Sequence, residues 1–351
     1  MEKENAVMET EPAGQGAAAP VTETLVASGT AAAIRKRKPI NRAKLQDNLW
    51  GWAFVALLVI GTTLFVYVAF ILTLILSFTN YEGQALFKYF GSKQFGSFMD
   101  DALFWYKYMF RAESGSGWAN AGDMVNFWGT LGNSVFYLIG IPIGMILSVG
   151  IAVCMSRDIK FTNTFRVIYY IPTVASVVSI SLVWNRLFDI DGAINSILGS
   201  NINWLGGEAT IRKITILILT TWKGLGGSVI LFVAGMNGVN ASYHEAAEID
   251  GANAWQIFWR ITLPQLYPTI FYVLVTSVIG GMQIYVEPEL IYGSFSDPGV
   301  GVAVTPFVGY IMDVVSDQYY AYGCALSVML AIIIFIFTLI EFGLDARRDK
   351  V

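Results

Sequence analysis

Six long runs of apolar residues dominate the chain, and shorter polar segments separate them. Each run holds at least about 18 largely apolar residues, the length that a helix needs to cross the hydrocarbon core of a bilayer. Helices are expected because a spanning segment must satisfy its own backbone hydrogen bonds. The pattern predicts an all-α membrane protein with six transmembrane helices, at about 50–78, 131–155, 164–186, 213–237, 267–292 and 319–343.

The distribution of basic residues predicts the orientation of these helices. A cluster of Lys and Arg at 35–44 precedes the first run, more basic residues follow the last run, and the loop at 293–318 has none. Basic residues favour the cytoplasmic side, and an even number of spans puts both termini on one side. We expect a disordered cytoplasmic tail at 1–44, a membrane domain at 45–345 and a second cytoplasmic tail at 346–351.

Composition supports a membrane protein and excludes several other classes. Of the 351 residues, 55% are hydrophobic and 14% are charged, against about 25% charged in average soluble proteins. Because the basic cluster directly precedes a span, we attribute it to membrane orientation rather than to nucleic-acid binding, so lipid is an expected partner and nucleic acid is not. Two cysteines and one histidine cannot form a zinc site of the usual kind, and no metal is expected.

A polar island at 240–264 interrupts the apolar pattern between the fourth and fifth runs. Ser242 and Glu245 have the spacing of a capping box, which predicts the start of one short helix. Asn253 and Gln256 repeat that spacing and predict a second helix. Gly251 lies between them, where a left-handed residue would end the first helix. The island is therefore expected to be a helical hairpin.

The surface of this predicted hairpin suggests a docking element. Ala246 and Ala247 leave one face without bulky side chains, and Trp255 and Trp259 offer aromatic area. Pro264 is expected to end the second helix, because proline disfavours the α conformation of the residue before it. Such a hairpin could fit a groove on another protein. The alternative is an amphipathic hairpin that lies on the bilayer surface.

The hairpin resembles the EAA loop of membrane subunits of bacterial ATP-binding-cassette (ABC) importers, most closely the sugar permeases. The resemblance rests on one set of residues, which it implies are the ATPase-coupling positions: Glu245, Ala246, Ala247, Asp250, Gly251 and Pro264. It implies the type I importer permease fold and a location in the bacterial cell membrane. The partners implied are a second homologous permease subunit, two ATP-binding cassette subunits and an extracytoplasmic sugar-binding protein.

No enzymatic signature accompanies this loop. The chain contains no Gly-Lys-Ser/Thr sequence, so it lacks the phosphate-binding loop that would hold ATP. We expect no enzymatic activity and no cofactor in this chain, with ATP and magnesium bound by the partner ATPase. Energy for uphill transport would then enter through the hairpin.

Interrupted membrane helices are the best sequence indicator of a transport site. Glycines at 224–227 predict a break in the fourth span, and Gly280, Gly281 and Pro288 predict one in the fifth. Aromatic faces stack on sugar rings and amides bond to hydroxyls. The candidate substrate-binding residues are Trp222, Lys223, Gly224, Gln283 and Tyr285. In maltose-type permeases, positions similar to Lys223, Gly224 and Gln283 lie at the sugar site, whereas ordinary helix packing is the alternative for each aromatic residue.

Lys223 differs from the other candidates because a charge inside a span is costly unless it is paired. Glu287 is its expected partner. The favoured cargo is a carbohydrate, and the resemblance favours an oligosaccharide. Glycerol phosphate esters are an alternative for the same machinery. An ion-coupled secondary transporter is the alternative from another class, but the chain shows no internal repeat. The aromatic loop at 79–130 could pack on protein or anchor at the membrane interface.

Overall fold

The computed structural model describes residues 42–79, 81, 83, 103–111, 127–156, 162–293 and 303–348. Residues 1–41, which hold the first part of the predicted basic cluster at 35–44, and the chain end at 349–351 lie outside these residues. The chain divides into two units, Met1–Ile60 and Gly61–Val351. This division falls inside the first predicted span, and the predicted domain boundary at 44 stays a prediction.

All regular structure in the described residues is helical. Four continuous helical stretches are long and apolar enough to cross a membrane: Trp50–Leu76, Phe127–Met155, Ala209–Asn237 and Tyr320–Arg347. Two bent pairs of helices also qualify, which gives up to six spans when each pair counts as one. The predicted all-helical membrane fold with six spans is confirmed in this form.

The first and second stretches each consist of consecutive helical elements. The first contains α1 (Arg42–Thr62), the π-helix η1 (Thr63–Val68) and α2 (Ala69–Leu76). The second contains α6 (Phe127–Tyr137) and α7 (Gly140–Met155). Within the larger unit, α2 packs against α18 (Tyr320–Arg348), and α7 packs against α11 (Ala209–Asn237).

The third predicted span is sharply bent, which the sequence did not predict. It consists of α8 (Thr162–Val174) and α9 (Val177–Leu187), and the helices on the two sides of the break make an angle of 107°. Pro172 in the last turn of α8 has no N–H to continue the helical hydrogen bonds. Ser176 then adopts ψ 130°, outside the helical region, and ends the turn between the helices.

The fourth predicted span is continuous, so the predicted break at 224–227 is wrong. α11 runs without interruption from Ala209 to Asn237. Gly226 instead permits close packing, because a Cβ built there would lie 2.1 Å from the backbone oxygen of Tyr169 in α8. The glycine is therefore required by contact between helices and not by a change of backbone direction.

Replacing Gly226 by alanine should destabilise the protein, since the new methyl group would meet a backbone atom that cannot rotate away. Overpacking of this kind costs about 1–3 kcal/mol. Gly227→Ala is the matched control, because its Cβ would meet only Thr173 Cγ2 at 4.0 Å. Thermal unfolding of the detergent-purified protein should show a lower Tm for Gly226→Ala alone; equal Tm values for the two variants would contradict the packing role.

The fifth predicted span does break, and the break lies after its glycine pair. α15 (Tyr267–Met282) ends before Gln283, and α16 (Val286–Tyr292) begins after Tyr285. Pro288 lies inside the first turn of α16, where a missing N–H leaves no helical bond unmade. The predicted interruption of this span is confirmed, with the gap at 283–285.

The described part of the aromatic loop packs on protein. α5 (Phe104–Arg111) holds the buried Met109, and Trp105 Nε1 donates a hydrogen bond of 2.8 Å to the backbone oxygen of Thr79. The Tyr106 hydroxyl bonds Ser77 Oγ at 2.9 Å, and the Tyr108 ring meets the Tyr322 ring edge to face. Of the two interpretations of this loop, packing on protein is favoured for residues 103–111.

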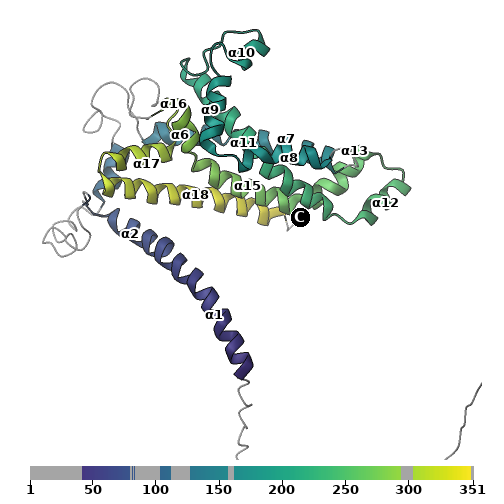
Figure 1. Cartoon of the computed structure of the whole chain (residues 1–351), viewed down its shortest axis with the longest axis horizontal. Coiled ribbons are helices and arrows are strands. Elements are labelled where there is room, and N and C mark those ends of the chain that lie inside the picture. Colours follow the sequence, from purple (N-terminus) through teal and green to yellow (C-terminus); the bar gives the residue numbers. More distant parts are fainter. Residues whose placement is uncertain are drawn as a thin grey trace, which may run out of the picture. The chain divides into compact units, whose positions relative to one another are not determined.

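Short helices occupy both ends of the larger unit. At one end, α16 and α17 (Phe307–Ser316) lie near α6 (Figure 1). At the opposite end, α12 (Ala241–Ile249) and α13 (Ala254–Ile257) lie towards the C-terminal end of α18 (Figure 1). α10 (Ala193–Leu198) follows α9. The Tyr137 hydroxyl donates to the Val304 backbone oxygen at 2.7 Å and ties α6 to the segment before α17. The predicted hairpin and residues 303–316 of the predicted 293–318 loop therefore lie at opposite ends of this unit.

Candidate functional site

A cavity of about 540 Å³ lies between α7, α11 and α15. It reaches the bend between α8 and α9, through Thr173 and Val177, and the break between α15 and α16, through residues 283–287. Close packing shapes its wall: a Cβ on Gly140 would lie 2.6 Å from Thr221 Oγ1, and one on Gly281 would lie 2.8 Å from Leu138 Cδ2. The cavity thus lies beside the bend of the third predicted span and the break in the fifth.

Four of the five predicted substrate residues line this cavity. They are Lys223, Gly224, Gln283 and Tyr285. Trp222 does not line it, and its role as a substrate contact stays a prediction. Its ring packs edge to face on Trp184 of α9 at 5.2 Å between centroids. Neighbouring helix positions point about 100° apart, and this rotation directs Trp222 towards α9 while Lys223 lines the cavity.

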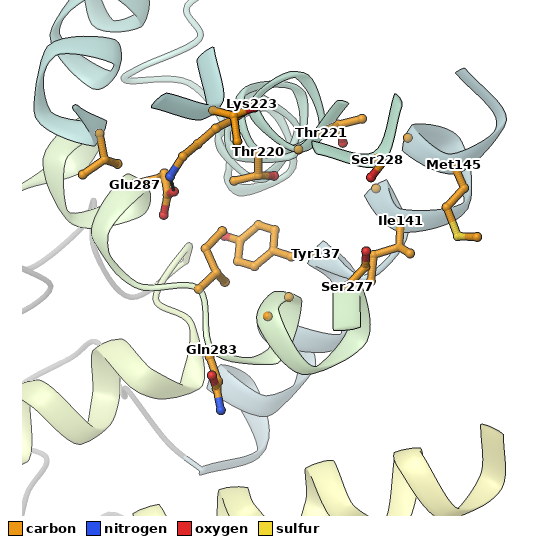
Figure 2. Close-up of a pocket in the computed structure, with 18 of the residues that line it drawn as sticks. Tyr137, Ile141, Met145, Thr220, Thr221, Lys223, Ser228, Ser277, Gln283 and Glu287 are labelled. Atoms are coloured by element: carbon orange, nitrogen blue, oxygen red, sulfur yellow. Dashed lines mark hydrogen bonds and ion pairs between the residues drawn. The ribbon is translucent and has the colours of Figure 1, made fainter. Parts of the chain in front are cut away.

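Lys223 and Glu287 form the predicted ion pair. Lys223 Nζ lies 2.5 Å from Glu287 Oε1, with side-chain exposures of 29% and 13% (Figure 2). The pair joins α11 to the first turn of α16. No other Asp, Glu, Lys or Arg lines the cavity in the described part of the chain. The lining therefore contains one cation and one anion that neutralise each other.

Several polar groups of the lining have no hydrogen bond or ion pair within the described residues: the hydroxyls of Thr221, Ser228 and Ser277 and the amide of Gln283. Thr221, Gly224 and Ser228 recur at the spacing of one helix face. That periodicity could have revealed them in the sequence. Ser277 comes from another helix, and no local pattern pairs it with α11. Together these groups can donate to and accept from a polar ligand.

The predicted hairpin forms the second candidate site, and its first helix begins differently from the prediction. α12 (Ala241–Ile249) is capped by Asn240, whose side chain accepts a hydrogen bond from the Ser242 backbone N–H at 3.1 Å. The predicted Ser242–Glu245 capping box is therefore wrong. Asn240 is an equally good capping residue and lies two positions earlier. Glu245 therefore does not cap the start of α12.

The turn of the hairpin agrees with the prediction. Gly251 has φ 79°, its N–H donates to the Glu248 oxygen at 3.0 Å, and the Ala252 N–H donates to the Ala247 oxygen at 2.9 Å. These bonds form a Schellman motif, which ends a helix at a left-handed residue. The second helix, α13 (Ala254–Ile257), begins with the predicted capping box between Asn253 and Gln256.

Pro264 does not end the second helix, so that prediction is wrong. α13 continues into the π-helix η4 (Phe258–Thr262) and then into α14 (Leu263–Gln265), and Leu263 keeps helical φ and ψ of −63° and −42°. The Leu263 N–H bonds the Phe258 oxygen, five residues back. A wider π-turn moves the preceding carbonyls and so accommodates proline. The chain bends by 62° only between Gln265 and Tyr267.

The predicted coupling residues lie on the surface of this hairpin. Glu245, Ala246 and Asp250 are exposed, and Ala247 is half-buried. Glu245 makes no hydrogen bond or ion pair within the described residues. Apolar side chains are exposed beside it, with Ile249 at 87% and Trp255 at 69%. A free carboxylate beside exposed apolar area is typical of a surface that another protein covers.

The described residues contain no group of three or more His, Cys, Asp or Glu that could hold a metal ion. Cys154 and Cys324 are both free thiols. The cavity and the hairpin are therefore the two candidate functional sites in the described residues.

Comparison with known proteins shows which family and which relatives the sequence resembles. Residues 140–350 match the model of a family described as binding-protein-dependent transport system inner membrane component. Among curated proteins, the probable ABC transporter permease protein YesP of Bacillus subtilis is 28% identical over 318 residues, covering 88% of this chain and 93% of that protein. The arabinooligosaccharides transport system permease protein AraP of Bacillus subtilis is 30% identical over 229 residues, covering 62% and 70%.

A solved structure shares the fold. One chain of a bacterial alginate ABC transporter, in complex with an alginate pentasaccharide-bound periplasmic protein, superimposes with a TM-score of 0.67 at 19% identity. The match covers 88% of this chain and 98% of that one. At this identity the similarity concerns the arrangement of the helices.

Proposed function

Because the chain belongs to the family of binding-protein-dependent transport system inner membrane components, we propose that it is a permease subunit of an ATP-driven importer for an uncharged carbohydrate. The proposed cargo is an oligosaccharide, as the name of the related AraP describes for that protein. An extracytoplasmic binding protein would deliver it. The protein is a multi-pass membrane protein, and the proposal places both termini and the 240–264 hairpin in the cytoplasm.

The chemistry of the cavity carries the proposal for the cargo. Sugar hydroxyls both donate and accept hydrogen bonds, and the lining offers the hydroxyls of Thr221, Ser228 and Ser277 for such contacts. The one cation, Lys223, is neutralised by Glu287. A phosphate ester would need unpaired positive charge to offset its loss of water. The lining thus favours an uncharged polyhydroxyl cargo over glycerol phosphate esters.

The hairpin supports an external source of energy. Glu245 and the exposed Ile249 and Trp255 offer a surface for an ATPase subunit. Movements of the ATPase subunit would be transmitted through α12 and α13 to the membrane helices, and movements caused by the cargo would be transmitted in the opposite direction. The proposal includes two ATP-binding cassette subunits, which bind ATP and magnesium, and a second permease, which completes the pathway around the cavity.

Deletion of the gene in its own cell tests this function. Uptake of radiolabelled neutral oligosaccharides should be lost for at least one member of a panel and restored by the wild-type chain, while glycerol 3-phosphate uptake stays unchanged. The restored uptake should survive an ionophore that dissipates ion gradients and stop when ATP is depleted. Loss confined to glycerol phosphate would overturn the cargo, and the opposite response to ionophore and ATP depletion would indicate a secondary transporter.

A further inference from the structure

The only histidine of the chain lies in α12, directly before Glu245. His244 Nε2 lies 3.2 Å from Thr262 Oγ1, which belongs to the π-helix η4 on the opposite arm of the hairpin. His244 is half-buried and Thr262 is buried, with 9% exposure. Eighteen residues separate them along the chain, so only the folded hairpin brings them together.

In the described residues, this contact is the one side-chain hydrogen bond that joins α12 to another helix. None of the nine residues of α12 is buried. In the described part of the chain, no other side-chain hydrogen bond, ion pair or ring contact connects α12 with a different helix. Hydrogen bonds also define its two ends, at the Asn240 cap and at the Schellman turn at Gly251. A helix with no buried residue can shift unless a side-chain contact with a neighbouring helix restrains it.

The other partner of the contact leads to the cavity. Thr262 is followed by α14 and, after the 62° bend, by α15. α15 contributes Ser277, Gly280 and Gly281 to the cavity wall. Thr262 lies in a π-turn, an irregularity that is frequent at functional sites. A movement of α12 that reaches Thr262 is therefore delivered to the helix that borders the proposed cargo.

We propose that His244 and Thr262 are positioning residues whose hydrogen bond makes α12 and α15 move as one body during the ATP cycle. The inference rests on the proposed function, since it assigns a role within the coupling of ATP to transport. A neutral imidazole can accept from or donate to the hydroxyl at Nε2, depending on its tautomer, and an imidazolium can donate. The contact therefore does not require one charge state of His244.

The chemistry of the contact determines the informative variants. His244→Gln places an amide that can donate and accept at a similar reach, and Thr262→Ser keeps the hydroxyl. His244→Ala and Thr262→Val remove the bond, and valine keeps the shape of threonine. Thr276→Val is the matched control for the loss of a threonine hydroxyl, because Thr276 Oγ1 bonds only backbone oxygens of its own helix, α15.

The test uses the full complex with its ATPase subunits, reconstituted in lipid nanodiscs. Cys154 and Cys324 are first replaced by serine, and spin labels are attached at Glu248→Cys in α12 and Tyr272→Cys in α15, two exposed positions. The distance between the labels is measured without nucleotide and after trapping with Mg-ATP and vanadate. In the wild-type background we expect one narrow distribution that is the same in both states.

His244→Ala and Thr262→Val should broaden this distribution and make it depend on the trapped state, because α12 would follow the ATPase without α15. Loss of one hydrogen bond should change the ratio of attached to detached α12 by about fivefold. His244→Gln, Thr262→Ser and Thr276→Val should keep the narrow distribution, and the double variant His244→Ala/Thr262→Val should add nothing to either single variant.

Two negative results would contradict different parts of the proposal. Narrow, state-independent distributions in both His244→Ala and Thr262→Val would overturn the positioning role. Failure of the wild-type chain to retain ATPase subunits would instead overturn the proposed function. The amount of each variant in the membrane and its Tm report on folding separately.

Discussion

Replacing Gly251 by proline should leave the protein inserted in the membrane and strongly reduce its uptake of cargo. Gly251 has φ 79°, whereas proline is restricted to about −65°. Proline also lacks the N–H that Gly251 donates to the Glu248 oxygen. Either loss costs on the order of 1–3 kcal/mol, and the two together should disrupt the turn. The angle between α12 and α13 would change, and the surface proposed to bind the ATPase would be lost.

The effect should stay within the hairpin, because nothing lies within 4 Å of a Cβ built on Gly251. Uptake should fall by at least about tenfold, which corresponds to 1.4 kcal/mol of coupling, while the amount of protein in the membrane stays near that of the wild type. Gly251→Asn is the matched control, since asparagine tolerates a positive φ. Undiminished uptake together with unaltered co-purification of the ATPase would refute the coupling role of the hairpin.

The elements that the sequence predicted best are those with a local physical cause. Long apolar runs gave the spans, and Asn253 with Gln256 formed its predicted capping box. Gly251 adopted its predicted left-handed conformation because few other residues do so at low cost. Each of these features depends on residues within a few positions of one another.

The failures depend on contacts between distant segments. The glycines at 224–227 favour a helix break locally, but Gly226 lies against the backbone of α8 and the helix stays whole. Pro264 favours a helix end locally, but the π-turn before it absorbs the proline. The pairing of His244 with Thr262 has no signal in the sequence, because it depends on how the hairpin folds.

The candidate site was predicted in part for the same reason. Lys223 and Glu287 are both costly in a membrane span, so the demand for a partner is visible without a structure, and the pair forms. Trp222 offered the right chemistry, but the rotation of α11 directs it to Trp184. Residue type indicates what a side chain can do, and the helix phase decides whether it reaches the cavity.

Breaking the Lys223–Glu287 pair from one side should impair transport more than removing both charges. Lys223→Met leaves the Glu287 carboxylate at 13% exposure without its partner, and Glu287→Gln leaves the ammonium without its partner. Loss of one member of a fully buried pair costs about 3–5 kcal/mol, and an exposed pair contributes about 0–1 kcal/mol. Because the pair is partly exposed, each single variant should lower the free energy of unfolding by an intermediate amount, about 2 kcal/mol.

The double variant Lys223→Met/Glu287→Gln should recover much of the loss, because it leaves no unpaired charge in the lining. Uptake of the neutral oligosaccharide found in the panel, together with Tm, measures all four corners of this cycle. Arg186→Met and Asp189→Asn form the matched control, since that pair lies 3.5 Å apart with side chains 86% and 50% exposed and should show little coupling. Fully additive effects of Lys223→Met and Glu287→Gln would show that the pair does not act as a unit, and the argument for an uncharged cargo would lose its basis.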